Sequence, residues 1–198
     1  MKDTELSALA AGQCERARKL LALCRIVEIW EMLGVKVEIV GSLRNGLMMK
    51  HRDIDLHLYS RFPSPSEGLA ALRTLAENHP VRRIEYTNLL NTPERCLEYH
   101  ILLPDAEGFE WQIDMIHIVS GSRYDGHFER VADRIAERFT PEMKRAVLRL
   151  KYETPDSESI PGVEYYHAVQ AGGVRTFAEF TEFRKHHPAA ELIDWMPA

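Results

Sequence analysis

The sequence predicts an α+β protein with a mixed β-sheet flanked by helices, followed by a C-terminal helical region. Two observations predict this class. Strand-like apolar runs fall between residues 35 and 119, whereas the segment after Gly121 shows only helical periodicity. The chain has 198 residues, of which 45% are apolar and 28% are charged. A globular chain of this size and composition can bury a full hydrophobic core.

The first part of the chain begins with an amphipathic helix over residues 5–33, where apolar residues recur every three or four positions and Gly34 provides the stop. The next elements are shorter and alternate in type. They are a strand over residues 35–40, a short helix over residues 42–49 after a turn at Gly41, and a strand over residues 53–59.

The stretch RFPSPSEG is predicted to be a loop, and Ser66 is the expected N-cap of a helix that runs to about Asn78. Thr140-Pro141 fits an N-cap followed by proline at the first helical position. The remaining elements fall into two sets. They are strands over residues 81–88, 96–103 and 110–119, with PDAEG as a hairpin turn, and helices over residues 128–139, 141–152, 163–170 and 177–186.

The change from strands to helices predicts a boundary near Ser120, with one domain over residues 1–120 and a helical region over residues 121–198. The N-terminus has early acidic residues and no long apolar core, and no run is long enough to span a bilayer. A cytoplasmic protein with no membrane partner is therefore expected. Cys14, Cys24 and Cys96 form no zinc-type or disulfide pattern and are expected to be buried thiols.

Two aspartates stand inside a strand that is otherwise apolar, in the stretch Asp53-Ile54-Asp55-Leu56. Because side chains alternate along a strand, Asp53 and Asp55 point to one face while Ile54 and Leu56 point to the core. Two neighbouring carboxylates repel each other, and a bound divalent cation removes that conflict. A solvent-facing edge strand is the simpler alternative.

A third carboxylate can complete such a site. Asp114 interrupts the apolar strand EWQIDMIHIV, so three acids converge if this strand lies beside the strand of Asp53. Three carboxylates suit two cations that clamp a phosphoryl group. Glu98 and Glu110 are competing acids on the neighbouring strand and on the same strand, and the third ligand is left open among them.

Gly41-Ser42 supplies a possible phosphate-binding turn. Glycine lets the backbone turn sharply next to a ligand, and the start of a helix presents free N–H groups to an anion. Ser42 offers a hydroxyl to the same phosphate, and a helix cap is its alternative role.

These residues together resemble the signature of the DNA polymerase β-like nucleotidyltransferase superfamily. The matching pattern is Val40-Gly41-Ser42, ten intervening residues, then Asp53-Ile54-Asp55-Leu56, with Asp114 on a later strand. The resemblance covers about residues 15–119 and implies a nucleotidyltransferase-like catalytic domain. It implies that Asp53, Asp55 and Asp114 bind two Mg²⁺ ions, with Mn²⁺ as a possible substitute, and that Gly41 and Ser42 hold the β- and γ-phosphates of a nucleoside triphosphate.

Basic and aromatic side chains give further candidates. Arg44, Lys144 and Lys151 are expected to meet the triphosphate, although a solvated helix face explains the lysines equally well. His57 shares the face of the aspartates but is expected to be a buried, hydrogen-bonded histidine. Tyr165 and Tyr166 are expected to pack in the core rather than to stack on a base.

The predicted function is metal-dependent transfer of a nucleoside monophosphate from a nucleoside triphosphate to a hydroxyl of a small molecule or a protein. The formal charge of −5 disfavours binding to long nucleic acid. One alternative is an inactive protein of this fold, such as a regulatory or toxin–antitoxin partner. Another is a metal-dependent phosphohydrolase, which leaves Gly41-Ser42 without a purpose. The acceptor, the nucleotide and the oligomeric state are not specified by the sequence.

Overall fold

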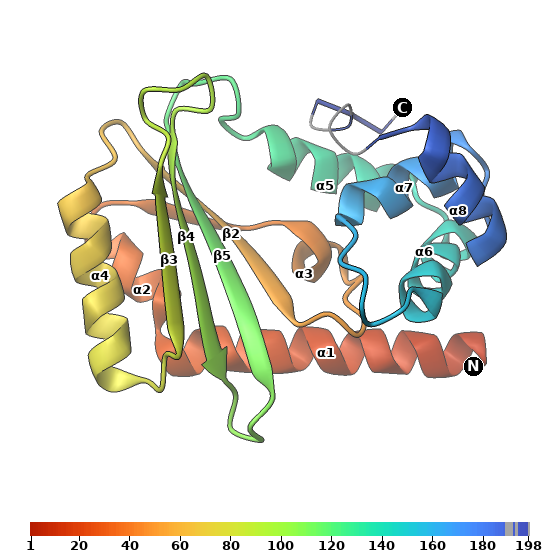
Figure 1. Cartoon of the computed structure of the whole chain (residues 1–198), viewed down its shortest axis with the longest axis horizontal. Coiled ribbons are helices and arrows are strands. Elements are labelled where there is room, and N and C mark those ends of the chain that lie inside the picture. Colours follow the sequence, from red (N-terminus) through yellow and green to blue (C-terminus); the bar gives the residue numbers. More distant parts are fainter. Residues whose placement is uncertain (189–191, 193, 198) are drawn as a thin grey trace. The chain divides into compact units, whose positions relative to one another are not determined.

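The computed structural model describes residues 1–188, 192 and 194–197 (Figure 1). The chain forms two compact units. Unit 1 comprises Met1–Glu15, Gly41–His51 and Glu129–Ala198, and unit 2 comprises Arg16–Val40 and Arg52–Phe128. The α+β class predicted from the sequence is confirmed.

Unit 2 contains one five-stranded mixed sheet with the order β1-β2-β5-β4-β3. β2 and β5 run parallel, and the other neighbouring pairs are antiparallel. The strands are β1 (Lys36–Ile39), β2 (Asp53–Ser60), β3 (Arg83–Asn88), β4 (Cys96–Pro104) and β5 (Glu110–Val119).

One face of this sheet is the core of unit 2. Helices α2 (Ile26–Glu31) and α4 (Pro65–Asn78) lie together on that side (Figure 1). Trp30 of α2 is 2% exposed, and its indole N–H donates to the sulfur of Met115 at 3.3 Å. Leu56 and Ile113 on the same face have no exposed surface, because the apolar residues of β2 and β5 alternate in phase.

The predicted N-terminal helix is wrong in one respect, since the chain forms α1 (Asp3–Cys24) and then α2. Arg25 separates them in a left-handed conformation with φ 51°. Apolar periodicity continues through both helices, so the pattern contains no sign of the break. The expected cap at Ser66 is also wrong, because Ser64 accepts from the backbone N–H of Glu67 and Pro65 opens α4.

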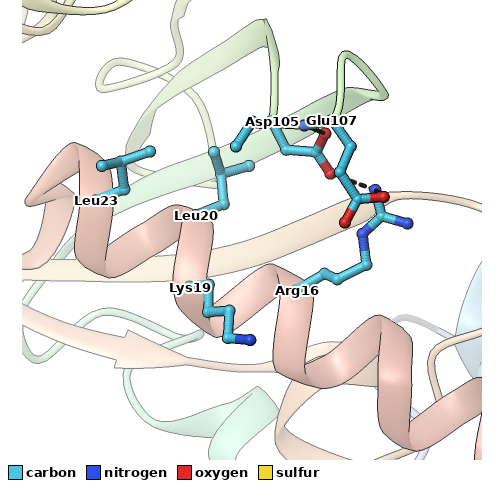
Figure 2. A pocket seen from close by; sticks show the side chains of 7 residues that line it. Arg16, Lys19, Leu20, Leu23, Asp105 and Glu107 are labelled. Carbon is cyan, nitrogen blue, oxygen red and sulfur yellow. Dashed lines mark hydrogen bonds and ion pairs between the residues drawn. The ribbon is translucent and has the colours of Figure 1, made fainter.

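The β4–β5 hairpin confirms the predicted PDAEG turn. The Asp105 carboxylate accepts hydrogen bonds from the backbone of Glu107 and Phe109 and from the indole of Trp111. Arg16 pairs with Asp105 at 2.7 Å and with Glu107 at 3.2 Å. Figure 2 shows Arg16, Asp105 and Glu107 at a pocket between α1 and the turn. The two ion pairs tie the hairpin to the helix.

Unit 1 is built from helices around a shared apolar core, which includes Leu47, Val147, Leu150, Tyr165 and Phe180. Thr140 caps α6 by accepting from the N–H of Met143, as predicted. The helices of the C-terminal region are α5 (His127–Arg138), whose first two residues belong to unit 2, α6 (Pro141–Glu153), α7 (Gly162–Ala171) and α8 (Phe177–His186). The predicted boundary near Ser120 remains a proposal.

Among the residues that the structure describes, none of the helices combines the length and apolar character that a bilayer crossing requires. Cys14, Cys24 and Cys96 are all buried free thiols, as expected.

Candidate functional site

The strand bearing Asp114 lies directly beside the strand bearing Asp53 and Asp55. In the parallel pair of β2 and β5, Asp55 is the register partner of Asp114, and Asp53 is the partner of Gln112. Residues two apart on a strand share a face, so all three aspartates lie on the same side of the sheet. This face is opposite the one that packs on α2 and α4.

Around the aspartates the two faces differ in burial, whereas His57 and Tyr59, farther along the aspartate face of β2, are also buried. Asp53, Asp55 and Asp114 are half-buried, whereas Ile54, Leu56 and the other apolar neighbours on β2 and β5 are buried. A solvent-facing edge strand does not explain the aspartates, because β2 and β5 are interior strands of the sheet.

Asp114 is held by two side chains on the same face. Nδ1 of His100 lies 2.6 Å from Oδ1 of Asp114, and His100 is the register partner of Asp114 on β4. The amide nitrogen of Gln112 donates to both carboxylate oxygens, at 2.9 and 3.2 Å. Because an ionised carboxylate only accepts hydrogen bonds, Nδ1 of His100 carries the proton in this pair.

The donor set fits a hard divalent cation in its chemistry, since Mg²⁺ and Mn²⁺ prefer carboxylate oxygens. Across residues 1–188, 192 and 194–197, however, no three His, Cys, Asp or Glu side chains are gathered into an arrangement that would hold a metal ion. The shared face and the donor type therefore support a metal site, and the two-metal arrangement stays a proposal.

The Gly41-Ser42 step opens α3 (Gly41–Asn45) in unit 1. Gly41 has φ 61°, a left-handed backbone conformation that residues other than glycine adopt only with strain. Ser42 lies inside α3 rather than at its N-cap, so the alternative role as a helix cap is wrong.

Lys151 of α6 contacts Ser42 inside unit 1. Its ammonium donates to Oγ of Ser42 at 2.7 Å, to the carbonyl of Leu47 at 3.0 Å and to the hydroxyl of Tyr166 at 3.5 Å. Lys151 is only 9% exposed, so the interpretation of this lysine as part of a solvated face is wrong. A buried ammonium held by uncharged oxygens gains strongly from a nearby anion.

The other two predicted phosphate contacts, Arg44 and Lys144, lie on α3 and α6. Arg44 is bound to Asp133 at 2.8 Å, which occupies part of its guanidinium. Lys144 is half-buried on α6. On the same helix, Arg145 and Arg149 both pair with Asp3.

The aromatic and histidine interpretations agree with the structure. His57 is 6% exposed, its Nδ1 lies 3.3 Å from the Tyr59 hydroxyl, and its ring meets Phe128 edge-on at 4.9 Å. Burial, aided by the nearby His127, lowers the pKa of His57 to about 4, so this imidazole is neutral. Tyr165 and Tyr166 are buried, and Tyr165 stacks on Phe180 with centroids 4.7 Å apart.

The two competing acids differ in environment. Glu110 is exposed and paired with Arg82 at 2.6 Å, which provides a separate role for it. Glu98 is half-buried on the face of Asp114, but its register partner on β5 is Ile116. Asp114 is the acid aligned with Asp55, and it is retained as the proposed third ligand.

His100 is a site neighbour that the sequence interpretation missed, and Gln112 was recognised as sharing the face of Asp114 but was given no role. A usable signal exists, because counting outward from the hairpin turn pairs Pro104 with Glu110 and therefore His100 with Asp114. Gln112 precedes Asp114 by two residues and so shares its face.

Comparison with solved structures identifies the fold. Cid1 poly(U) polymerase bound to MgATP aligns over 80% of this chain and 50% of its own, with TM-score 0.58 and 18% identity. A cytoplasmic RNA terminal U-transferase aligns over 84% and 54%, with TM-score 0.54 and 15% identity. Cid1 with the UTP analogue UMPNPP aligns over 80% and 48%, with TM-score 0.54 and 16% identity. The chain spans about half the length of these structures.

These neighbours are DNA polymerase β-like nucleotidyltransferases, so the fold implied by the Gly-Ser and Asp-x-Asp pattern is confirmed. No protein-family model matches the sequence. A search of the curated proteins finds no match either. The likeness in three dimensions therefore identifies the fold alone.

Proposed function

We propose that this protein is a metal-dependent nucleotidyltransferase that moves a nucleoside monophosphate from a nucleoside triphosphate to an acceptor hydroxyl. The observation that carries the proposal is the alignment of Asp55 with Asp114 on adjacent strands, with Asp53 on the same face. The Mg²⁺–nucleotide complexes among the structural neighbours support the same reaction class and the same cofactor.

The reaction is an in-line displacement at the α-phosphorus. The acceptor oxygen forms a bond to the α-phosphorus, the bond to the bridging oxygen of the β-phosphate breaks, and pyrophosphate leaves. Asp53, Asp55 and Asp114 would hold the cations, and Asp114 would also take part in removing the proton from the acceptor hydroxyl. Bound Mg²⁺ would neutralise the charge that develops on the transferred phosphoryl group.

The triphosphate tail is assigned to Gly41, Ser42 and Lys151. Gly41 permits the sharp turn, and Ser42 donates its hydroxyl. Lys151 donates to Ser42, which supports the assignment of its ammonium to the same phosphate charge. Arg44 and Lys144 are assigned more peripheral contacts to the same phosphates. α3 is a single turn, and we assign little of the binding to its helix dipole.

The proposed acceptor is a hydroxyl of a small molecule or a protein, since the net charge of −5 disfavours extended contact with nucleic acid. The names of the structural neighbours favour a second acceptor class, the terminal hydroxyl of RNA. The nucleotide itself is left open, because the neighbours include complexes with ATP, GTP and a UTP analogue.

The test is a screen of the four radiolabelled nucleoside triphosphates with Mg²⁺ or Mn²⁺. Acceptors are pooled metabolites, the protein itself, and a short single-stranded RNA. Pyrophosphate release coupled to label transfer supports the proposal, and the labelled product identifies the acceptor class. Release of inorganic phosphate alone indicates a phosphohydrolase. Nucleotide binding without turnover under all conditions indicates an inactive member of the fold.

A further inference from the structure

His100 stands next to the proposed catalytic carboxylates without belonging to them. Asp114 on β5 has Asp55 as its register partner on one side and His100 as its partner on the other. The imidazole therefore occupies the flank of Asp114 that faces away from Asp55.

We propose that His100 is a positioning residue that fixes the carboxylate of Asp114 for cation binding and acceptor activation. This inference depends on the proposed function of that carboxylate. An aspartate carboxylate rotates in a broad, nearly two-fold potential, so its plane is not set by its own torsion angle. His100 donates to Oδ1 from the neighbouring strand and Gln112 donates to both oxygens from its own strand, so two separate directions fix the plane.

His100 and Asp114 do not need each other as hydrogen-bond partners in order to be solvated. The side chains of His100 and Asp114 are 28% and 22% exposed, so water can reach both groups. A direct hydrogen bond of 2.6 Å between groups that water could satisfy indicates an orienting role. The donated N–H also offsets part of the negative charge that Asp114 shares with Asp55 across the strand pair.

The arrangement leaves lone pairs of Asp114 for a ligand. A carboxylate offers about four acceptor directions, and the contacts of His100 and Gln112 use three of them. Groups that hold metal-binding carboxylates in place commonly affect metal affinity or activity by about 10–100-fold when they are removed. The same range is expected here.

The experiment compares His100→Leu with His100→Asn in the full chain. Leucine removes the donor, whereas the asparagine amide nitrogen falls close to the position of Nδ1 and restores it. His79→Leu, at the C-cap of α4, is the matched control for loss of a histidine. Circular dichroism and thermal unfolding check that each variant folds. The first readout is Mn²⁺ affinity, from the free Mn²⁺ signal in electron paramagnetic resonance, and the second is kcat and KM for pyrophosphate release.

The expected result is a loss of about 10–100-fold in Mn²⁺ affinity or kcat for His100→Leu, substantial recovery in His100→Asn, and an unchanged KM for the acceptor. Equal behaviour of wild type and His100→Leu overturns the positioning role while transfer stands. Equal loss in His100→Leu and His100→Asn also overturns it, because the hydrogen bond is then not the cause.

If wild type transfers no nucleotide, the proposed function fails. A fall in Mn²⁺ affinity in His100→Leu would still support positioning, and unchanged or absent Mn²⁺ binding would overturn it.

Discussion

Asp55 of β2 and Asp114 of β5 are direct register partners in the parallel strand pair at the middle of the sheet. Like charges placed opposite each other across two strands destabilise a sheet. The fold retains them on interior strands, with buried apolar residues on the opposite face. This combination supports the proposal that the two carboxylates serve binding or catalysis rather than stability.

The first prediction concerns Asp55→Asn. Nucleotide transfer is expected to fall by about 10³-fold, because the variant removes a proposed ligand of the cation whose charge would neutralise the reacting phosphate. The free energy of unfolding is expected to rise by about 0.5 kcal/mol as repulsion with Asp114 is relieved. Transfer is measured by pyrophosphate release, and stability by denaturant unfolding.

Glu110→Gln is the matched control for Asp55→Asn. Glu110 lies on β5 but is exposed and paired with Arg82, so its variant is expected to keep its transfer rate. Full activity in Asp55→Asn, or a comparable loss in Glu110→Gln, would contradict the assignment of the carboxylates.

The second prediction uses the backbone of Gly41. Gly41→Ala forces a side chain into φ 61°, which is expected to cost about 1–2 kcal/mol of stability and to weaken nucleoside triphosphate binding. Gly12→Ala should have the opposite sign. Gly12 lies within α1 with nothing within 4 Å of an added Cβ, so a gain of about 0.5–1 kcal/mol is expected. Denaturant unfolding and nucleotide titration measure both, and a tolerated Gly41→Ala would argue against the phosphate-binding turn.

The third prediction is that Lys151→Met weakens both stability and triphosphate binding. The change leaves the oxygens of Ser42, Leu47 and Tyr166 without their donor, which is expected to cost about 1–3 kcal/mol. Binding of a nonhydrolysable nucleoside triphosphate, followed by calorimetry, is expected to weaken more than binding of the corresponding monophosphate. The two ligands are compared because only the triphosphate carries the β- and γ-phosphates that are assigned to Lys151.

Lys144→Met provides the stability control on the same helix. Lys144 is half-buried, so its loss is expected to change stability by no more than about 0.5 kcal/mol. If Lys151→Met loses monophosphate and triphosphate affinity in equal proportion, the lysine acts through folding alone and its assignment is wrong.

Much of the fold follows from local pattern. Alternating apolar residues place β2, β4 and β5 within about a residue of their observed bounds, since one buried face requires period two. Thr140-Pro141 predicts the start of α6 for a similarly local reason. The break at Arg25 has no such signal, because a left-handed residue between two amphipathic helices leaves their periodicity unchanged.

The candidate site is less accessible to sequence reasoning. Asp53, Asp55 and Asp114 stand out because polar residues interrupt apolar strands. Pairing Asp114 with Asp55 additionally requires knowing that β2 and β5 are parallel neighbours, which depends on tertiary packing. Lys151 gives the clearest example of this limit. Helical periodicity alone leaves it on a basic surface, and only the packing of α6 against α3 places its ammonium among buried oxygens.

The final prediction concerns acid stability and His117. This residue is 3% exposed, its Nε2 lies 2.8 Å from the Ser60 hydroxyl, and its ring meets Trp30 edge-on at 5.7 Å. Burial lowers the pKa of His117 to about 4, below its ordinary value of 6.5. The unfolded chain therefore binds this proton at higher pH than the folded chain does. The contribution of His117 to the free energy of unfolding is fully present above about pH 6.5. It is lost as the pH drops toward 4, by up to roughly 3 kcal/mol.

His117→Gln tests this prediction, because glutamine can keep a hydrogen bond to Ser60 but does not titrate in this range. Urea unfolding of both proteins is measured at half-unit steps from pH 7.5 to pH 4. The variant is expected to be less stable than wild type at pH 7.5 and to lose less stability on acidification. His79→Gln is the matched control for loss of a histidine, at the partly exposed C-cap of α4. If wild type and His117→Gln follow parallel pH profiles, His117 does not couple folding to protonation.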